Sequence, residues 1–138
     1  AKFHPGGILV KRLYLRVSDL YKFNETPMVL PDAPMPRVIL EISGKCLGVT
    51  AVVVDQKVIG AITDGDLRRM LEKNPDYSNL TAERVMTHNP KTIRENKLAV
   101  EAFDMMKKKN ITNLFVVNEN DEYLGVIHLH DIIKEGIL

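Results

Sequence analysis

An internal repeat of about 65 residues runs through this 138-residue chain and limits its fold to one built from two similar units. Residues 58–67 align with residues 123–132 at an offset of 65, and residues 45–53 align with residues 109–117 at an offset of 64. We expect the one-residue difference to fall in a turn. Because a fixed repeat implies two copies of one structural unit, the elements are predicted copy by copy.

Each copy predicts the same order of elements. A short extended segment, at 28–30 and 92–94, precedes an amphipathic helix, which is clearest where Leu98, Ala102, Met105 and Met106 follow helical spacing. Two strands joined by a polar turn follow, at 50–55 with 58–63 and at 114–118 with 123–128, and each pair leads into a short helix, at 64–72 and 129–135. A β-α-β-β-α unit of this size cannot cover both faces of its sheet. We therefore expect an α+β fold with two repeats packed sheet to sheet about a pseudo-two-fold axis, which creates two equivalent clefts.

Charge and composition exclude several classes of partner. Nineteen Lys and Arg against 18 Asp and Glu leave a net charge of +1, so no positive field favours nucleic acid or an anionic membrane surface. The apolar runs are far shorter than the roughly 20 residues of a membrane span. Cys46 is the single cysteine and cannot form an internal disulfide, and no signal peptide is evident. We expect a cytoplasmic protein that binds neither nucleic acid nor a membrane.

The repeat resembles a tandem pair of CBS domains, with one copy at 17–75 and the other at 76–138. The resemblance extends to the C-terminal part of bacterial arabinose-5-phosphate isomerases. It is carried by the HPGG segment at 4–7 and by residues 13–20, 63–69 and 124–131. In that family an N-terminal sugar-isomerase (SIS) domain interconverts ribulose 5-phosphate and arabinose 5-phosphate, which feeds the synthesis of Kdo, the acidic sugar of lipopolysaccharide.

The resemblance implies that this chain is a fragment without its catalytic domain. Ala1 is not an initiator Met, and residues 1–16 are expected to be the end of the SIS domain and a linker. His4, the histidine of HPGG, is implied to belong to the isomerase active site and to act only together with the SIS domain, its partner in the parent chain. We expect the fragment alone to be no enzyme, while the parent chain is a sugar-phosphate isomerase.

Thr63 and Asp66 lie where a predicted strand runs into a predicted helix. One interpretation is a capping box, in which both side chains satisfy N–H groups of the first helical turn. The other is a ligand site, because helix N-termini accept phosphate and a carboxylate accepts hydrogen bonds from ribose hydroxyls. The resemblance implies this second role. Asp64 and Asp66 alone would repel a phosphate, but Arg68 and Arg69 on the next turn reverse the local charge.

In the second copy His128 takes the place of the Thr, followed by His130 and Asp131. We expect His128 and His130 to bind the ligand through their imidazoles, which can contact a base or a sugar acid. Asp131 aligns with Asp66 and inherits the ribose-binding role by resemblance. A metal site is the weaker interpretation, because structural zinc sites use four protein ligands and His4 and His88 have no ligand spacing to this pair. We expect no metal and no cofactor.

The sequence therefore predicts a regulatory module that binds a nucleotide or nucleotide-sugar between its repeats. The unequal copies favour an unsymmetrical ligand with a ribose, a phosphate and a carboxylate, which CMP-Kdo provides. AMP or ATP is the alternative ligand. A structural module that only assembles subunits is the alternative function, and we expect a homo-oligomer formed through apolar helix surface such as Leu98, Ala102 and Met105.

Overall fold

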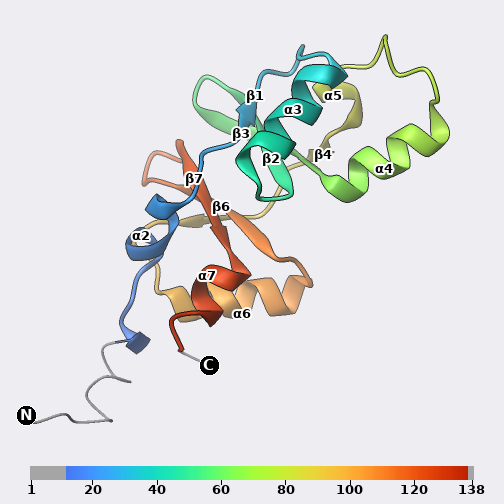
Figure 1. Cartoon of the computed structure of the whole chain (residues 1–138). Coiled ribbons are helices and arrows are strands. Elements are labelled where there is room, and N and C mark those ends of the chain that lie inside the picture. Colours follow the sequence, from blue (N-terminus) through green and yellow to red (C-terminus); the bar gives the residue numbers. More distant parts are fainter. Residues whose placement is uncertain (1–11, 137–138) are drawn as a thin grey trace, which may run out of the picture.

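The computed structural model describes residues 12–136, which form two β-sheets with helices on their outer sides (Figure 1). The first sheet has the order β1 (Met28–Val29), β2 (Val49–Val54), β3 (Lys57–Thr63), β4 (Thr87–His88). The second has the order β5 (Thr92–Arg94), β6 (Asn113–Val117), β7 (Tyr123–His128). The helices are α2 (Val17–Leu20), η1 (Tyr21–Phe23), α3 (Met35–Lys45), α4 (Asp64–Lys73), α5 (Ala82–Val85), α6 (Ala99–Lys109) and α7 (Leu129–Ile133).

The two repeats have the same topology. In each, the first strand runs parallel to the second, with α3 or α6 as the connection, and the second and third strands form an antiparallel hairpin. The first hairpin turns through Asp55 and Gln56, both with positive φ, the combination that a two-residue type I′ turn requires. The second turn is one residue longer, since the Asn118 N–H donates to the Glu122 carbonyl at 3.0 Å. The difference in repeat offset therefore falls in a turn, as expected.

The central helices also end alike. Helix α3 begins after Pro34 with Pro36 in its first turn, where a missing N–H costs little. It ends at Cys46 in the left-handed conformation, and α6 ends at the equivalent Asn110 in the same conformation. Both ends lead into the central strand of their sheet.

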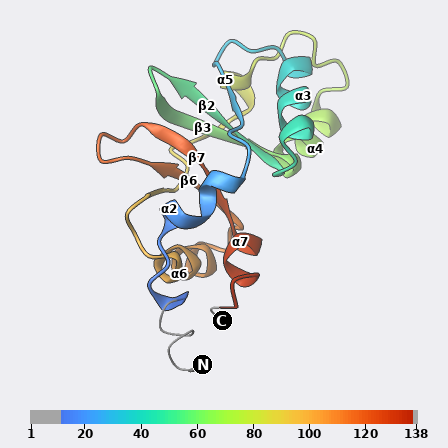
Figure 2. The same cartoon turned by 60° about the vertical axis from the view of Figure 1, so that its left-hand side comes forward.

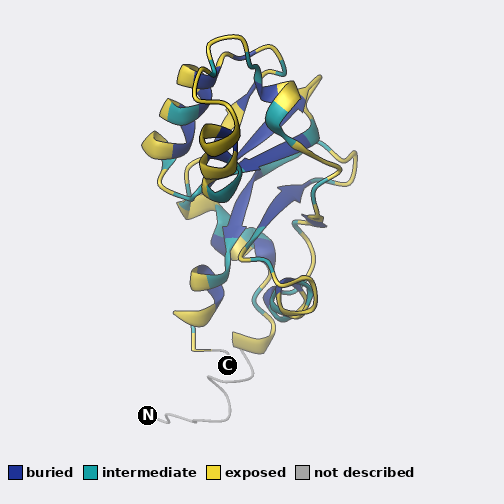
Figure 3. Cartoon of the chain, turned by 90° about the vertical axis from the view of Figure 1, so that its right-hand side faces the viewer, coloured by how far each residue is buried: buried dark blue, intermediate teal, exposed yellow. Residues whose placement is uncertain are grey.

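The packing of sheet against sheet is confirmed. One core cluster takes residues from both sheets: Val49, Ala51, Val53, Ala61, Phe115 and Val126. Figure 2 shows the two sheets lying between α3 and α4 at one end and α6 and α7 at the other. The strands are mostly buried and the outer helix faces exposed (Figure 3). A ligand that binds between the repeats therefore meets mainly strand ends and loops.

Four short elements were not predicted, α2, η1, α5 and β4, and all of them contact the sheet of the other repeat. Helix α2, at the start of the first repeat, packs with Val17 and Leu20 in the core of the second sheet. Helix α5, which precedes the second repeat, places Ala82 in the core of the first sheet, and β4 pairs with β3. Each sheet is thus completed by a segment that belongs to the other repeat.

The apolar surface expected on α6 is not there. Ala102 is fully buried in the core of the second sheet, and Met105 packs against the same cluster. Large exposed apolar side chains lie instead at Leu40 on α3, Leu71 on α4 and Ile133 on α7. His4 lies outside the described residues. Within residues 12–136, no helix is long and apolar enough to cross a membrane.

Candidate functional site

A cavity of about 520 Å³ opens between the two repeats beside the N-terminus of α4. The first repeat contributes residues from β2, β3 and α4, and the second contributes β4, β6 and the segments that precede β5 and β6. Val49, Ala61 and Phe115, members of the inter-sheet core, form an apolar part of its lining. A volume of this size, with polar side chains around an apolar wall, suits a small molecule.

Thr63 and Asp66 form a complete capping box at the start of α4. The Thr63 Oγ1 accepts from the Asp66 N–H at 3.1 Å, and the Asp66 Oδ2 accepts from the Thr63 N–H at 2.9 Å. This confirms the capping interpretation. It does not exclude a ligand, because the Thr63 hydroxyl accepts in the box and its own proton can be donated to a bound group.

Arg69 reaches back from α4 to the same carboxylate. Its Nη2 lies 2.7 Å from the Asp66 Oδ1, and its side chain is 65% exposed against 16% for Asp66. Since a salt bridge with one largely exposed partner contributes little, Arg69 can move from Asp66 toward an arriving anion at small cost. Lys91 adds a second cation to the lining.

Three predicted site residues therefore meet in this cavity: Thr63, Asp66 and Arg69. Asp64 and Arg68 are exposed on α4 and are not among the residues that line it. The Asp64 N–H donates to the Gly48 carbonyl at 3.0 Å, so this residue helps to fix the helix start.

The predicted residues of the second repeat form the corresponding helix cap at α7. The His128 Nδ1 accepts from the His130 N–H at 3.0 Å, and the Asp131 Oδ2 accepts from the His128 N–H at 2.8 Å. Within residues 12–136, no three His, Cys, Asp or Glu side chains gather in an arrangement that could hold a metal ion.

The expectation of two equivalent clefts is wrong, because Asn24 occupies the place beside Asp131. Its Nδ2 donates to the Asp131 Oδ2 at 2.7 Å and to the Val126 carbonyl at 2.9 Å. Asp131 is only 7% exposed. Tyr21 packs on Gly125 so closely that a Cβ there would lie 2.9 Å from the Tyr21 Cδ1. The carboxylate that would bind a ribose is thus already paired within the chain.

Sequence reasoning missed Asn24, Lys91 and Asn113. The available signal was the difference between copies: at an offset of 64, Asn24 aligns with His88 and Asn113 aligns with Val49. A change of side-chain type at aligned positions, from amide to imidazole or from amide to apolar, marks a place where the two clefts differ.

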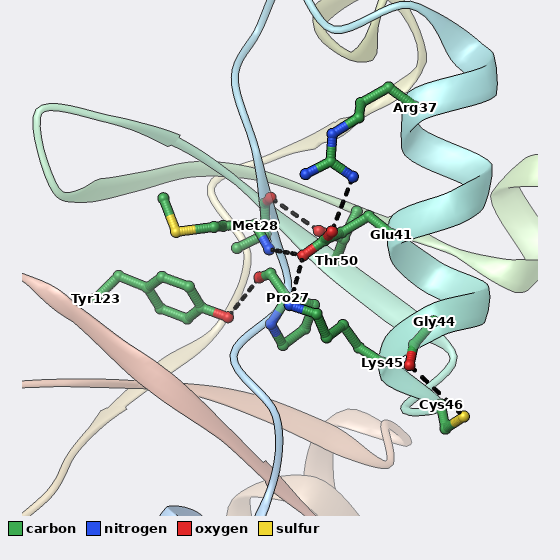
Figure 4. A network of polar contacts seen from close by, with 10 residues as sticks. Pro27, Met28, Arg37, Glu41, Gly44, Lys45, Cys46, Thr50 and Tyr123 are labelled. Carbon is green, nitrogen blue, oxygen red and sulfur yellow. Dashed lines mark hydrogen bonds and ion pairs between the residues drawn. The ribbon is translucent and has the colours of Figure 1, made fainter.

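A polar network at the opposite face of the first sheet fixes how the repeats meet (Figure 4). The buried Glu41 accepts from the Met28 N–H at 2.9 Å and pairs with Arg37 and Lys45. Burial raises the pKa of Glu41, but these hydrogen bonds outweigh it and hold the pKa below its ordinary value.

Tyr123 ties the second repeat to this network. Its hydroxyl donates to the Pro27 carbonyl at 2.7 Å (Figure 4). Burial, and then the charge of Glu41, raise the pKa of Tyr123 above its ordinary value. The hydroxyl therefore stays protonated and keeps donating across the junction of the repeats.

Comparison with known proteins agrees with the repeat. The sequence profile of the CBS domain matches twice, at residues 17–73 and 82–137. Arabinose 5-phosphate isomerase KdsD of Yersinia pestis is 40% identical over 137 residues, 98% of this chain and 42% of that protein. KdsD of Francisella tularensis is 42% identical over 132 residues, 95% of this chain and 40% of that protein. The chain thus spans about two fifths of these relatives and matches their C-terminal part.

Solved structures share the fold at low sequence identity. A CBS domain protein, NE2398, has a TM-score of 0.78 at 17% identity, covering 89% of this chain and 98% of that one. PAE2072 from Pyrobaculum aerophilum, complexed with AMP, has a TM-score of 0.76 at 22% identity, covering 85% and 89%. The CBS pair of MJ0100, in complex with 5′-methylthioadenosine and S-adenosyl-L-methionine, has a TM-score of 0.77 at 21% identity, covering 88% and 94%. With its profile matched in both repeats and its sheets arranged as in these structures, the chain belongs to the CBS-domain family.

Proposed function

We propose that this chain is the regulatory module of an arabinose-5-phosphate isomerase and binds one nucleotide or nucleotide-sugar in the cavity at Thr63 and Asp66. The observation that carries the proposal is the cavity itself, which combines an apolar wall, a carboxylate, a hydroxyl at a helix N-terminus and two cations. Two CBS proteins of the same fold were solved with adenine nucleotides or nucleosides. The relatives at about 40% identity support the parent activity.

Each part of a nucleotide has a counterpart in the cavity. The base packs against Val49, Ala61 and Phe115. The ribose hydroxyls donate to Asp66, and the phosphate lies at the N-terminus of α4 beside the Thr63 hydroxyl. Arg69 leaves Asp66 as the ribose arrives and turns to an anionic group of the ligand.

A ligand with a further carboxylate suits this site, because Arg69 and Lys91 provide two cations against one Asp66. CMP-Kdo has a ribose, a phosphate and a carboxylate, and as the activated end product of a Kdo pathway it would act as a feedback signal. This proposal assigns the carboxylate to Arg69 and Lys91, since Arg68 does not line the cavity. AMP or ATP is the alternative ligand.

The closed second cleft limits the module to one ligand per chain. Asn24 already pairs with Asp131, so the ribose position there is taken. His128 and His130 serve the cap of α7 in this state. One open site therefore remains for the ligand, and His4 keeps its proposed role in the isomerase active site of the parent chain only.

Isothermal titration calorimetry tests the proposal with CMP-Kdo, CMP, AMP and ATP. Asp66→Asn keeps an oxygen for the helix cap but removes the charge that orders the ribose, and should weaken binding about 10-fold or more, since hydrogen bonds to charged groups contribute about 1.5 to 3 kcal/mol. Asp131→Asn is the matched control in the closed cleft and should leave binding unchanged. Absence of binding by all four compounds, or equal binding to the Asp66→Asn variant, contradicts the proposal. In the full-length enzyme, the compound that binds should change isomerase activity.

A further inference from the structure

Asn113 brings an unsatisfied polar group to the apolar part of the cavity. The residue starts β6 and lines the cavity with Phe115, two residues further on the same face of the strand. Its Oδ1 is buried and accepts no hydrogen bond from any described residue. A buried acceptor without a partner destabilises the protein, so its presence here calls for a reason.

The repeat supplies an internal comparison. Asn113 aligns with Val49, and both are paired across their hairpins with the residue that caps the following helix, His128 and Thr63 respectively. Val49 lies in the inter-sheet core and shows that the fold needs no polar side chain at this position. The amide of Asn113 is therefore not required by the hairpin or by the packing of the sheets.

We propose that Asn113 reads the base of the bound nucleotide by accepting a hydrogen bond from its exocyclic amino group. This inference rests on the proposed function, because it places the base against Val49, Ala61 and Phe115. The unpaired Oδ1 belongs to a side chain that lines the cavity, so a ligand amino group that reaches it supplies the missing donor. The ligand class is then a nucleotide of an amino-bearing base, cytosine or adenine.

The other polar residues of the cavity lining leave recognition of the base to Asn113. The remaining uncharged polar residues of the lining, such as Thr87, Asn89 and Asn110, are exposed at its rim, where water satisfies them. Among residues 12–136, Asn113 is the lining residue with a buried side-chain oxygen that accepts no hydrogen bond. Discrimination is strongest at such a group, because a base that fails to satisfy it leaves it unpaired.

The test compares nucleotides that differ by the amino group alone. AMP is paired with purine riboside 5′-monophosphate, and CMP with the pyrimidin-2-one riboside 5′-monophosphate. On the unaltered fragment, removing the amino group from the preferred nucleotide should weaken binding about 2- to 12-fold, the range of one neutral hydrogen bond. On Asn113→Val, which copies the first repeat, the paired nucleotides should bind equally.

Controls separate this inference from the proposed function and from misfolding. Thr92→Val, on the exposed surface of the same sheet, should keep the discrimination. Thermal unfolding of ligand-free Asn113→Val should show a Tm equal to or above that of the unaltered fragment, since an unsatisfied acceptor is removed. If the unaltered fragment binds AMP or CMP but does not distinguish the analogues, or if Asn113→Val still distinguishes them, the readout is refuted while the proposed function stands. If AMP, CMP, ATP and CMP-Kdo all fail to bind, both are refuted.

Discussion

We predict that Asn24 stabilises the fold by closing the second cleft. The loss in free energy of unfolding on replacing Asn24 measures this stabilisation. The Nδ2 group donates to a buried carboxylate at 2.7 Å and to a backbone carbonyl at 2.9 Å. A hydrogen bond to a charged group contributes about 1.5 to 3 kcal/mol and a neutral one about 0.5 to 1.5 kcal/mol. Because water enters part of the vacated space, we expect Asn24→Ala to lower the free energy of unfolding by about 2 to 3 kcal/mol.

Asn24→Asp tests the charge at the same position. Two carboxylates about 3 Å apart repel by roughly 5 kcal/mol at an effective dielectric constant of about 20, an upper limit that protonation of one of them relieves. The folded state of this variant then holds a proton that the unfolded state releases. Its stability relative to the unaltered chain therefore rises as the pH falls from about 7 to about 5.

Urea unfolding at both pH values measures these differences. Asn79→Ala, in the exposed segment before α5, is the control and should lie within about 0.5 kcal/mol of the unaltered chain. Equal stability of Asn24→Ala and the unaltered chain would refute the closed cleft. So would an Asn24→Asp variant whose deficit does not depend on pH.

Four further predictions follow from other parts of the molecule. Glu41→Gln should lower the free energy of unfolding by about 1 to 2 kcal/mol at pH 7. Because the folded pKa of Glu41 is lowered, its carboxylate stabilises the fold above the unfolded pKa, and this stabilisation is lost as the pH falls through the folded pKa. Urea unfolding below about pH 5 should therefore show a smaller difference between the variant and the unaltered chain. Gly60→Ala places a Cβ against the Met86 Sδ and 3.0 Å from the Met86 Cβ, and should lower the free energy of unfolding by about 1 to 3 kcal/mol in the same assay. Stability equal to that of the unaltered chain would contradict the tight contact. The exposed apolar side chains of α3, α4 and α7 predict a homo-oligomer, which sedimentation at tens of micromolar tests, and a strictly monomeric mass would count against it. The chain alone should not interconvert ribulose 5-phosphate and arabinose 5-phosphate, and turnover by the purified fragment in a coupled assay would overturn this.

The repeat made most of the fold predictable. Strand β7 was predicted with the bounds that the structure has, and β2, β3 and β6 within one residue at each end. Alternating apolar residues and turn signals carry that information locally. Helices α2, η1 and α5 and strand β4 were missed, because segments of two to four residues show no periodicity. They form through contacts with the other repeat.

The candidate site was less predictable for the same reason. Thr63 and Asp66 were found because their spacing is local, and the capping box confirms it. The closure of the second cleft depends on a contact between Asn24 and Asp131, 107 residues apart. No pattern within either copy indicates that contact. Comparing the copies position by position, as with Asn113 and Val49, is the way to find such differences.

The central claim is that one nucleotide or nucleotide-sugar binds per chain, and native mass spectrometry tests it most directly. The purified fragment, sprayed with CMP-Kdo, CMP, AMP or ATP in turn, reports the number of ligands and of subunits in one spectrum. We expect one bound ligand per chain, at a clearly lower occupancy in Asp66→Asn and an unchanged occupancy in Asp131→Asn. Two ligands per chain, or none with any of the four compounds, would contradict it.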